Sequence, residues 1–436
     1  MQNRSSAAYC AAIGCPEGSH MTSPSSTPPT LIRHAQVVDA ATGSLREDAD
    51  VLVAGGLIQE VGRGLRSSLP GLVELDAHGR SLFPGLIDAH VHVTAVRRDL
   101  RESAALPKSY VAAAAGAQLR TMAGRGFTTV RDAGGADWGL AQAAADGLLG
   151  PASRLVFGGR ALSQTGGHGD LRGREGGADP CCSIGQVCDG PDEVRRAVRQ
   201  RIASGAGHIK LMLGGGLSSE LDRLDGDQFA EDEVRLAVDE ADAGGIYVTG
   251  HAYTPESISR AVRLGVACIE HGNLLDARTA ALMAAQGVFL VPTLVTYEDI
   301  ADYVSSGDAP RHYAEKLAIV RESGVRAIEL AVEAGVPVAF GTDLLGPGHA
   351  RQLDEFTLRR DVQSPLSLLQ SATTTGARLL RHEGRLGVIR PGARADLIVS
   401  DLDPTTEYLD GLRKQPYVVM AGGVFTDSDA GRVLGA

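Results

Sequence analysis

The sequence predicts an α/β protein in which a (β/α)8 TIM barrel carries a small β-sandwich formed by both ends of the chain. Three observations support this prediction. Short apolar stretches alternate with helical patterns through the middle of the chain, whereas both ends carry short strands separated by glycine-containing turns. Polar residues follow the apolar stretches, as at the carboxyl-terminal mouth of a barrel. The 436 residues leave room for a barrel of roughly 250 residues and a companion domain.

The N-terminal segment 1–30 is expected to be a disordered tail or tag. It is rich in Ser, Thr and Pro and lacks the basic and apolar regions of a signal peptide. Gly18-Ser19-His20-Met21 resembles the remnant of an expression vector, so Met21 is the expected natural start. The other predicted segments are 31–83 for the first part of the sandwich, 84–383 for the barrel and 384–436 for the second part.

Eight strands with helices between them are predicted in the barrel region. The alternation implies parallel pairing, and eight strands suit a closed barrel. The predicted strands are 85–92, 128–132, 154–157, 208–212, 246–249, 269–271, 288–292 and 336–340. The predicted helices are 190–204, 231–243, 254–264, 276–286 and 327–334. At the ends of the chain, strands are predicted at 31–34, 51–54, 396–399 and 417–424.

Composition excludes several classes of function. The formal net charge of -11 argues against a nucleic-acid partner or an anionic membrane surface. No stretch approaches the roughly 18 consecutive apolar residues of a membrane helix, so we expect no membrane partner and a cytoplasmic location. Cys181, Cys182 and Cys188 share one loop, where free thiols are expected rather than a second metal site. Adjacent cysteines lack the two-residue spacer of zinc knuckles.

His90 and His92 end the first predicted strand of the barrel. In an extended strand their side chains point to the same face, so both can reach one metal ion. By itself such a pair is as often structural as metal-binding. Four more candidate ligands follow later apolar stretches in order: Lys210, His251, His271 and Asp343.

A lysine among metal ligands requires an explanation, because an ammonium group has no lone pair. The neutral amine of Lys210 can react with carbon dioxide to form a carbamate, whose two oxygens can bridge two metals. We therefore expect two divalent metal ions, zinc first among Zn, Mn, Fe and Co. One ion would be held by His90, His92, Asp343 and the carbamate, and the other by the carbamate, His251 and His271. A shared water would have its pKa lowered from about 15.7 toward neutrality, and Asp343 would pass its proton to the leaving group.

The chain resembles the metal-dependent amidohydrolase superfamily over about residues 31–424, through these six ligands. The closer resemblance is to the imidazolonepropionase-like branch that contains Xaa-Pro dipeptidases, Xaa-Arg carboxypeptidases and ochratoxinase. The motifs that carry it are Thr165-Gly166-Gly167-His168-Gly169-Asp170, His208-Ile209-Lys210-Leu211-Met212, His251-Ala252-Tyr253 and Gly392-Ala393-Arg394-Ala395-Asp396-Leu397.

The resemblance implies a binuclear, usually zinc, hydrolase that cleaves an amide next to a terminal carboxylate and assembles as a homo-oligomer. It implies catalytic roles for Asp343 and His271, and catalytic or substrate-binding roles for His168 and Tyr253. His168 could instead sit in a structural turn, and Tyr253 could simply pack against the rim. His349 is a further candidate for substrate binding. Together with Glu355 it follows Asp343 on a loop, and for both residues a structural role is equally open. The segment 214–219 and the Asp-rich stretch after it depart from the usual relatives.

The predicted function is hydrolysis of an amide bond by metal-activated hydroxide, releasing the C-terminal amino acid from an N-acyl amino acid or dipeptide-like substrate. This is chemistry of the carboxypeptidase, prolidase or ochratoxin A hydrolase type. One alternative is a cyclic amide hydrolase or a deaminase of the same superfamily. Mononuclear relatives generally lack the lysine that this chain has, although dihydroorotase-like cyclic amidases keep it. The other is a non-catalytic oligomeric scaffold, which would be expected to have lost ligands.

Overall fold

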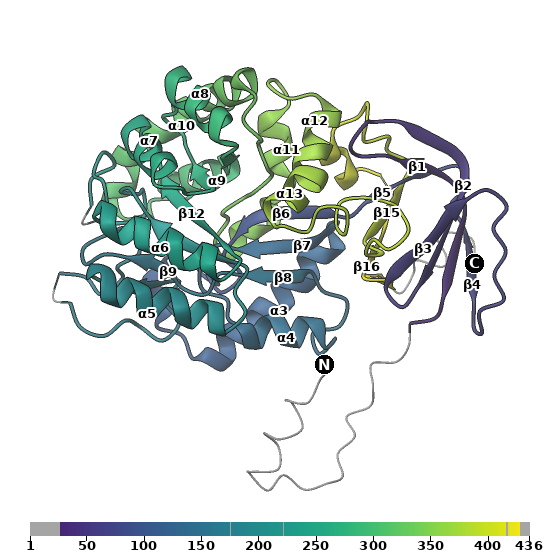
Figure 1. Cartoon of the computed structure of the whole chain (residues 1–436), viewed down its shortest axis with the longest axis horizontal. Helices are drawn as coiled ribbons and strands as arrows, with labels where there is room; N and C mark the ends of the chain where they lie inside the picture. The colour runs from purple at the N-terminus through teal and green to yellow at the C-terminus, as the bar shows by residue number, and fades with distance from the viewer. Residues whose placement is uncertain (1–26, 175, 221, 416, 428–436) are drawn as a thin grey trace, which may run out of the picture.

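Two regions of different character make up the computed structural model, which describes residues 27–427 except 175, 221 and 416. Strands from both chain ends lie together on the right of Figure 1, and parallel strands with most of the helices lie on the left. The predicted tail falls outside the described residues up to residue 26. Thr30 was predicted as its last residue, which is wrong, because Thr30 is buried in β1 and pairs with Val53.

One eight-stranded sheet joins the two chain ends. β5 pairs with β15 antiparallel, with Phe83 opposite Ile398, so the pairing is continuous from the first half to the second. The predicted halves therefore belong to one sheet, and its division into two facing layers stays a prediction. The strands are β1 Thr30–Val38, β2 Leu45–Ala54, β3 Leu57–Gly62, β4 Val73–Asp76, β5 Ser81–Pro84, β15 Leu397–Ser400, β16 Tyr417–Ala421 and β17 Val424–Phe425.

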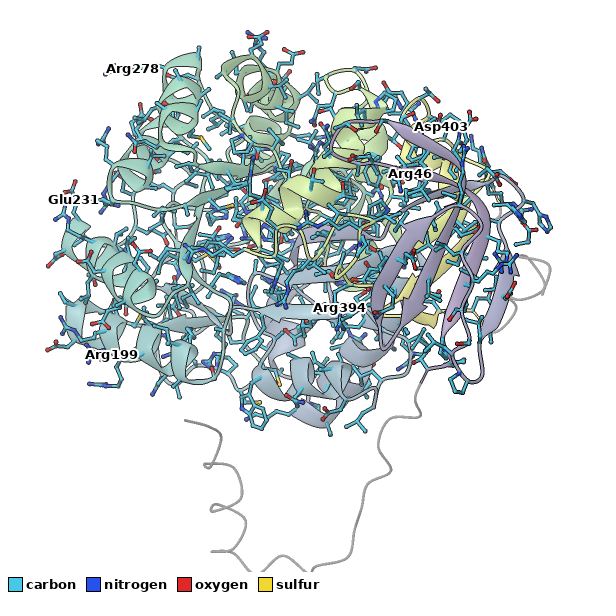
Figure 2. All side chains as sticks on the ribbon, turned by 45° about the vertical axis from the view of Figure 1, so that its right-hand side comes forward. Arg46, Arg199, Glu231, Arg278, Arg394 and Asp403 are labelled. Carbon is cyan, nitrogen blue, oxygen red and sulfur yellow. The ribbon has the colours of Figure 1, made fainter. Side chains whose placement is uncertain are left out.

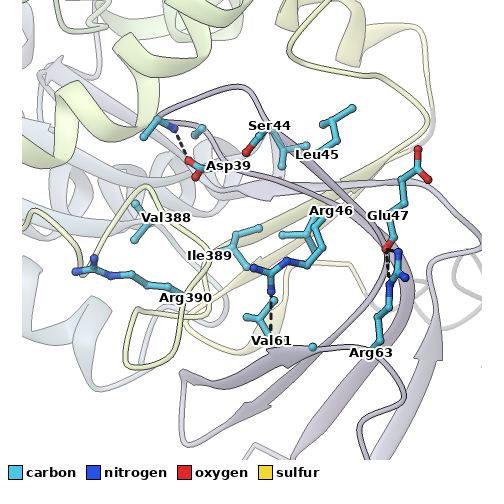
Figure 3. A pocket seen from close by; sticks show the side chains of 15 residues that line it. Asp39, Ser44, Leu45, Arg46, Glu47, Val61, Arg63, Val388, Ile389 and Arg390 are labelled. Carbon is cyan, nitrogen blue, oxygen red and sulfur yellow. Dashed lines mark hydrogen bonds between the residues drawn. The ribbon is translucent and has the colours of Figure 1, made fainter.

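A cavity of about 880 Å³ opens beside this sheet, between β1, β2, β3 and the segment 388–390 (Figure 3). Two of the arginine side chains that line this cavity donate hydrogen bonds to backbone carbonyls. Arg46 donates to the Val61 carbonyl at 3.4 Å, and Arg63 donates to the Glu47 carbonyl at 2.9 Å. None of the predicted site residues lines this cavity.

Parallel strands form two further sheets, of three and six strands, which confirms the α/β class. The first sheet is β6 Leu86–Val91, β7 Phe127–Asp132 and β8 Arg154–Phe157. The second is β9 Ala161–Ser163, β10 Gly185–Val187, β11 His208–Met212, β12 Tyr247–Ala252, β13 Cys268–His271 and β14 Phe289–Val291. Sequence analysis missed β9 and β10, because three residues are too few to show a period.

The eighth predicted strand, 336–340, is not a regular strand in the structure. Pro337 has no N–H to donate, and only Val338 forms a bridge, to Leu290. The segment still lies between β14 and β6, because the Pro337 carbonyl accepts from Leu290 N at 3.0 Å and the Phe340 carbonyl from Ala89 N at 2.8 Å. Closure of the strands into a barrel stays a prediction.

The helices predicted at 190–204, 231–243, 254–264 and 276–286 are present, whereas those at Lys108–Gly124, Trp138–Ala145 and Leu294–Ser305 were not predicted. Thr254 and Asp276 cap two of the predicted helices by accepting from Ser257 N and Thr279 N. Charged side chains such as Arg199, Glu231 and Arg278 point outward in Figure 2. The principal helices are α2 Leu100–Ala104, α3 Lys108–Gly124, α4 Trp138–Ala145, α5 Gly190–Ala203, α6 Glu231–Ala243, α7 Pro255–Arg263, α8 Ala277–Gln286, α9 Leu294–Ser305 and α10 Arg311–Ala334.

Shorter helical turns complete the chain: η1 Gly346–Arg351, α11 Asp354–Arg359, α12 Pro365–Gln370, η2 Ser371–Thr375, α13 Gly376–Leu379 and η3 Leu409–Arg413. The prediction for 327–334 caught only the last third of α10. None of the described helices has the length and apolar composition needed to cross a membrane. The predicted compartment and oligomeric state stay predictions.

The cysteines of the predicted loop are free, as expected. Cys181 Sγ lies 3.5 Å from Cys182 Sγ, whereas Cys188 is buried in the apolar core, and burial raises its pKa to about 12. Among the described residues these three do not meet as a metal-ligand group.

Candidate active site

All six predicted metal ligands line one cavity of about 50 Å³. β6, β11, β12 and β13 contribute a residue each. His92 follows β6 directly, and Asp343 lies three residues after the segment 336–340. His271 and Asp343 adopt left-handed backbone angles, with φ of 71° and 52°. Such angles are costly for residues other than glycine and tend to occur at functional sites. The cavity-lining ligands are His90, His92, Lys210, His251, His271 and Asp343.

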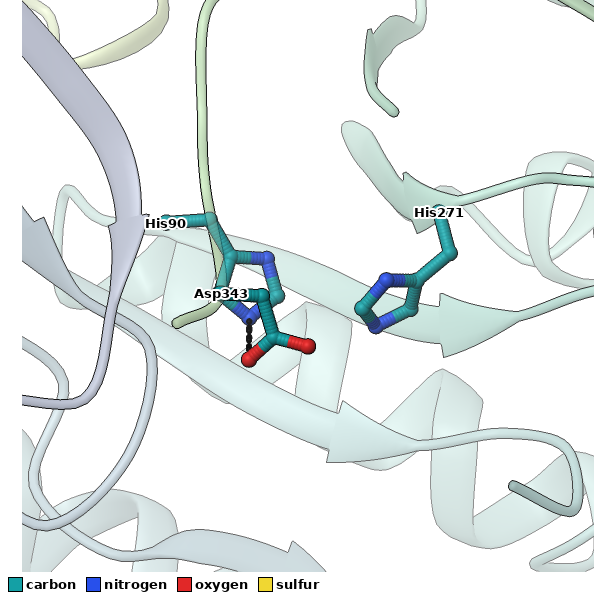
Figure 4. Close-up of side chains that lie close together, drawn as sticks. All are labelled: His90, His271 and Asp343. Atoms are coloured by element: carbon teal, nitrogen blue, oxygen red, sulfur yellow. Dashed lines mark ion pairs between the residues drawn. The ribbon is translucent and has the colours of Figure 1, made fainter. Parts of the chain in front are cut away.

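Asp343 lies where the histidine rings converge. Its Oδ1 is 3.4 Å from His90 Nε2 and 3.2 Å from His92 Nε2. Ligand atoms of His90, His271 and Asp343 all lie within 4.8 Å of one another, as in a metal site (Figure 4). The ring of His271 is also 4.6 Å from that of His251, which continues the cluster toward β12.

Hydrogen bonds orient the imidazoles. Nδ1 of His90 donates to Glu270 Oε2 at 2.7 Å, and Nδ1 of His92 donates to the Gly134 carbonyl at 2.8 Å. His271 Nδ1 contacts Thr293 Oγ1 at 2.8 Å. In each ring, Nε2 remains available for a ligand inside the cavity. Tying one ring nitrogen to an outer partner is typical of metal-ligating histidines.

His251 has the opposite orientation. Its Nε2 lies 3.2 Å from the Gly215 carbonyl, so Nδ1 is the available nitrogen. This arrangement of histidine donors, with one carboxylate and one lysine, fits two divalent cations.

Burial controls the charge states in the cavity. It lowers the pKa of His251 and His271 well below the ordinary value, which favours the neutral ligand form. Burial also lowers the pKa of the Lys210 amine, and the neutral amine is the form that carbamate formation needs. Burial alone would raise the pKa of Asp343, but His90 and His92 hold it well below its usual range.

Glu270 and Arg131 form a buried ion pair beneath the ligands, and sequence analysis missed both. Arg131 Nη2 lies 2.6 Å from Glu270 Oε1, and both side chains are fully buried. Glu270 also accepts from Thr249 Oγ1 and from His90. The sequence signal that could have found both is a charged residue inside an apolar strand, since such residues are seldom buried without a partner.

Asp88 is a second missed carboxylate. It accepts from His90 N at 3.1 Å, Thr342 Oγ1 at 2.7 Å and Gln352 Nε2 at 2.9 Å, and burial raises its pKa to about 6. Asp343 N donates to the His90 carbonyl at 2.7 Å. These contacts join β6 to the segment that carries Asp343.

His168 and Tyr253 also line the cavity, as predicted for residues that face substrate. The His168 ring stacks on His251 with centroids 4.3 Å apart. Tyr297 was missed; it lines the same wall, and its hydroxyl donates to Tyr253 Oη at 3.2 Å.

The structure does not bring His349 or Glu355 into this cavity. His349 is buried in η1, and burial lowers its pKa to about 3. Glu355 accepts from Val295 N at 2.8 Å and pairs with Arg359 at 3.7 Å. Their place after Asp343 in sequence did not predict the direction of their side chains.

The glycine run after β11 allows two close approaches. A Cβ atom on Gly216 would lie 1.9 Å from His168 Cε1, and one on Gly215 would lie 1.8 Å from the Arg223 carbonyl oxygen. Glycine at both positions therefore permits the loop to fold against His168.

Comparisons with known proteins agree with this geometry. The Amidohydrolase family model matches residues 81–426. Ochratoxinase from Aspergillus niger is 31% identical over 347 residues, covering 74% of this chain and 70% of that protein. Its crystal structure has a TM-score of 0.79 at 26% identity and covers 92% of this chain and 96% of that one.

Two solved peptidases are also similar. A prolidase complexed with N-methylphosphonate-L-proline is 42% identical, with a TM-score of 0.85. A Xaa-Pro dipeptidase with methionine bound in its active site is 30% identical, with a TM-score of 0.81. Each alignment covers 91% of this chain and 99% of the relative.

Proposed function

Because this chain belongs to the amidohydrolase family, and is thus a hydrolase of amide or peptide bonds, we propose that it uses two divalent cations, zinc first, to release the C-terminal residue of an N-acyl amino acid or dipeptide-like substrate. The observation that carries the proposal is the convergence of six potential ligands on one cavity, with three histidines tied outward through Nδ1. The solved relatives support it, since they include a prolidase and a Xaa-Pro dipeptidase.

His90, His92 and Asp343 would hold one cation, and His251 and His271 the other. Lys210, as its carbamate, would contribute to both. When bound, the cations supply a water of lowered pKa and polarise the scissile carbonyl.

In the same proposal the parallel strands close into a (β/α)8 barrel. The backbone bond from Gly207 to the Phe157 carbonyl at 2.9 Å supports closure between β8 and β11.

Asp343 is placed to accept a proton from the attacking water and deliver it to the leaving amine. A carboxylate of low pKa would be a weak base by itself, but it remains ionised and ready to accept at any ordinary pH. His271, whose ring nitrogen lies within 4.8 Å of an Asp343 carboxylate oxygen, is the other residue to which this proposal gives a catalytic role.

His168 and Tyr253 face the same space and are our candidates to hold the carbonyl oxygen or the terminal carboxylate of the substrate. The Tyr297 hydroxyl donates to Tyr253 Oη, which leaves the Tyr253 hydroxyl proton free to point at substrate.

The test is a mass-spectrometric screen of the metal-loaded protein against N-acyl amino acids, dipeptides and ochratoxin A, with elemental analysis of the same sample. We expect cleavage of a linear amide and about two metal ions per chain. Cleavage of ring amides alone would favour the cyclic amidase alternative. Full activity in a metal-free sample would refute the binuclear site.

A further inference from the structure

The cavity that the proposed metal ligands line also has an apolar lining. Six apolar side chains from several segments line it, together with Tyr253 directly after β12 and Tyr297 on α9. Most of these segments are loops or helix ends, which set specificity in enzymes built on a strand scaffold. The six are Leu100, Ile184, Met212, Leu217, Ile300 and Leu345.

Charged side chains are missing from this lining. Apart from the proposed ligands Lys210 and Asp343, no described residue that lines the cavity is an aspartate, glutamate, lysine or arginine. Apart from the histidines, the polar side chains of the lining are the hydroxyl groups of Ser218, Thr296, Tyr253 and Tyr297.

The carboxylate of Asp222, in the segment after Leu217, already has an ammonium partner. Asp222 Oδ1 lies 2.9 Å from Lys316 Nζ, and the two side chains are only 5% and 15% exposed. The same ammonium donates to the carbonyls of Gly216 and Ser219, at 2.8 and 2.6 Å. The loop that presents Leu217 is thus anchored by a pair that offers no free charge to a ligand.

A second carboxylate beside the cavity is also paired. Asp299 precedes Ile300 on α9 and accepts from Arg98 Nε and Nη2 at 2.9 and 2.8 Å. This bidentate bond satisfies both groups. A cationic substrate side chain would therefore enter the cavity without a counter-charge.

We propose that the enzyme selects substrates whose side chains next to the scissile amide are uncharged and apolar, with Leu217 and Ile300 as specificity-determining residues. The proposal rests on the amide hydrolysis proposed above. A cationic side chain would lose its hydration in the cavity with no free carboxylate as a partner, whereas an apolar one gains from burial. Of the activities found in the resembling branch, release of arginine is the one this cavity opposes.

The experiment uses two matched pairs of amides with the metal-loaded enzyme. On the leaving side, Nα-acetyl-L-norleucine is compared with Nα-acetyl-L-lysine. On the acyl side, hexanoyl-L-phenylalanine is compared with 6-aminohexanoyl-L-phenylalanine. Each pair differs only by a terminal amino group. We expect kcat/KM to favour the uncharged member more than tenfold in both pairs, and a smaller preference in either pair overturns the inference.

Binding to the Asp343→Asn variant separates this inference from the proposed function. Calorimetry of the same compounds should give a Kd more than tenfold lower for the uncharged members. Wild-type protein that hydrolyses none of them refutes the function, while a Kd ratio below ten, or no binding by any compound, refutes the selectivity.

Leu217→Glu and Leu217→Gln provide a gain-of-specificity test. The two side chains match in size, but only glutamate supplies a counter-charge. The lysine-to-norleucine ratio of kcat/KM should be at least tenfold higher in the glutamate variant, and equal ratios would contradict the assignment. If circular dichroism shows that the Leu217 variants do not fold, Ile300→Glu and Ile300→Gln replace them, because Ile300 on α9 is only half-buried. The lysine-to-norleucine ratio of kcat/KM then decides the outcome in the same way.

Discussion

His90 Nδ1 and Glu270 Oε2 lie 2.7 Å apart, with both side chains buried, and Glu270 is held from its other side by Arg131 at 2.6 Å. This chain of contacts runs from Arg131 on β7, through Glu270 on β13, to a proposed metal ligand. It fixes which nitrogen of His90 faces the cavity.

Replacing Glu270 with glutamine should therefore affect both stability and metal binding. Glutamine keeps the shape but leaves the Arg131 charge buried without a counter-ion, which costs about 3–5 kcal/mol of unfolding free energy. Weaker orientation of His90 should lower metal affinity about 10- to 100-fold. Urea unfolding and metal titration measure the two effects. Glu298→Gln, which breaks an exposed pair with Arg321, is the control and should cost less than about 1 kcal/mol. Equal losses in the two variants would contradict the role of Glu270.

Lys210→Ala tests the carbamate. Loss of the shared ligand should lower kcat/KM by about 1,000-fold, the scale of several kcal/mol of transition-state stabilisation, and reduce the metal content. Acetate or propionate should restore part of the activity, because a small carboxylate can occupy the space of the carbamate. Lys108→Ala, at the start of α3, serves as the control and should behave like wild type. Unchanged metal content in Lys210→Ala would exclude the lysine as a ligand.

Asp343→Asn removes the proposed proton acceptor while keeping its size. We expect kcat to fall by about 10²- to 10⁴-fold, as for loss of a general base, with a smaller change in KM. Steady-state kinetics and metal analysis of the same sample separate this effect from loss of metal. A wild-type kcat in this variant would show that Asp343 is not the proton acceptor.

Glu355 should make stability depend on pH. Burial raises its pKa to about 7 in the folded protein from an ordinary value of 4.5, so folding favours the protonated form. The stability contributed by this group is full below about pH 4.5 and declines by about 1.4 kcal/mol per pH unit as the pH rises toward 7. Urea unfolding of the wild type and Glu355→Gln across pH 5–8 measures the slope. A slope that is the same in both proteins would contradict the assignment.

Lys316→Met should loosen the loop after β11. It removes the ammonium partner of the buried Asp222 carboxylate, which keeps its contacts with Gly216 N, Gln228 Nε2 and His168 Nδ1. We expect a loss of about 3–5 kcal/mol in stability or in protection of this loop. Limited proteolysis of residues 214–226 and urea unfolding report the change. Adding Asp222→Asn should recover much of the loss, because the double variant buries neither charge. A double variant as unstable as the sum of the single changes would show that the two groups act independently.

Local pattern was enough for the helices α5 to α8 and for the strands that carry the predicted ligands, but α3, α4 and α9 were not predicted. The helix predicted at 231–243 is α6 with the same bounds, because its apolar spacing and the flanking glycines are local signals. The prediction of a regular strand around Pro337 was wrong, and the three-residue strand β9 was missed. In both segments, pairing with distant parts of the chain decides the conformation rather than the residues themselves.

The sequence by itself determined the identity and chain order of the proposed ligands, because residues at the ends of parallel strands gather at one edge whatever the loops do. Only the tertiary structure decided which nitrogen of each histidine faces the cavity, since Glu270, Gly134 and Thr293 reach their rings from distant segments. It also decided that Asp222 and Asp299 are paired and that the remaining wall is apolar. Such contacts join residues as many as 201 positions apart, as in Arg98 and Asp299, and no local pattern encodes them.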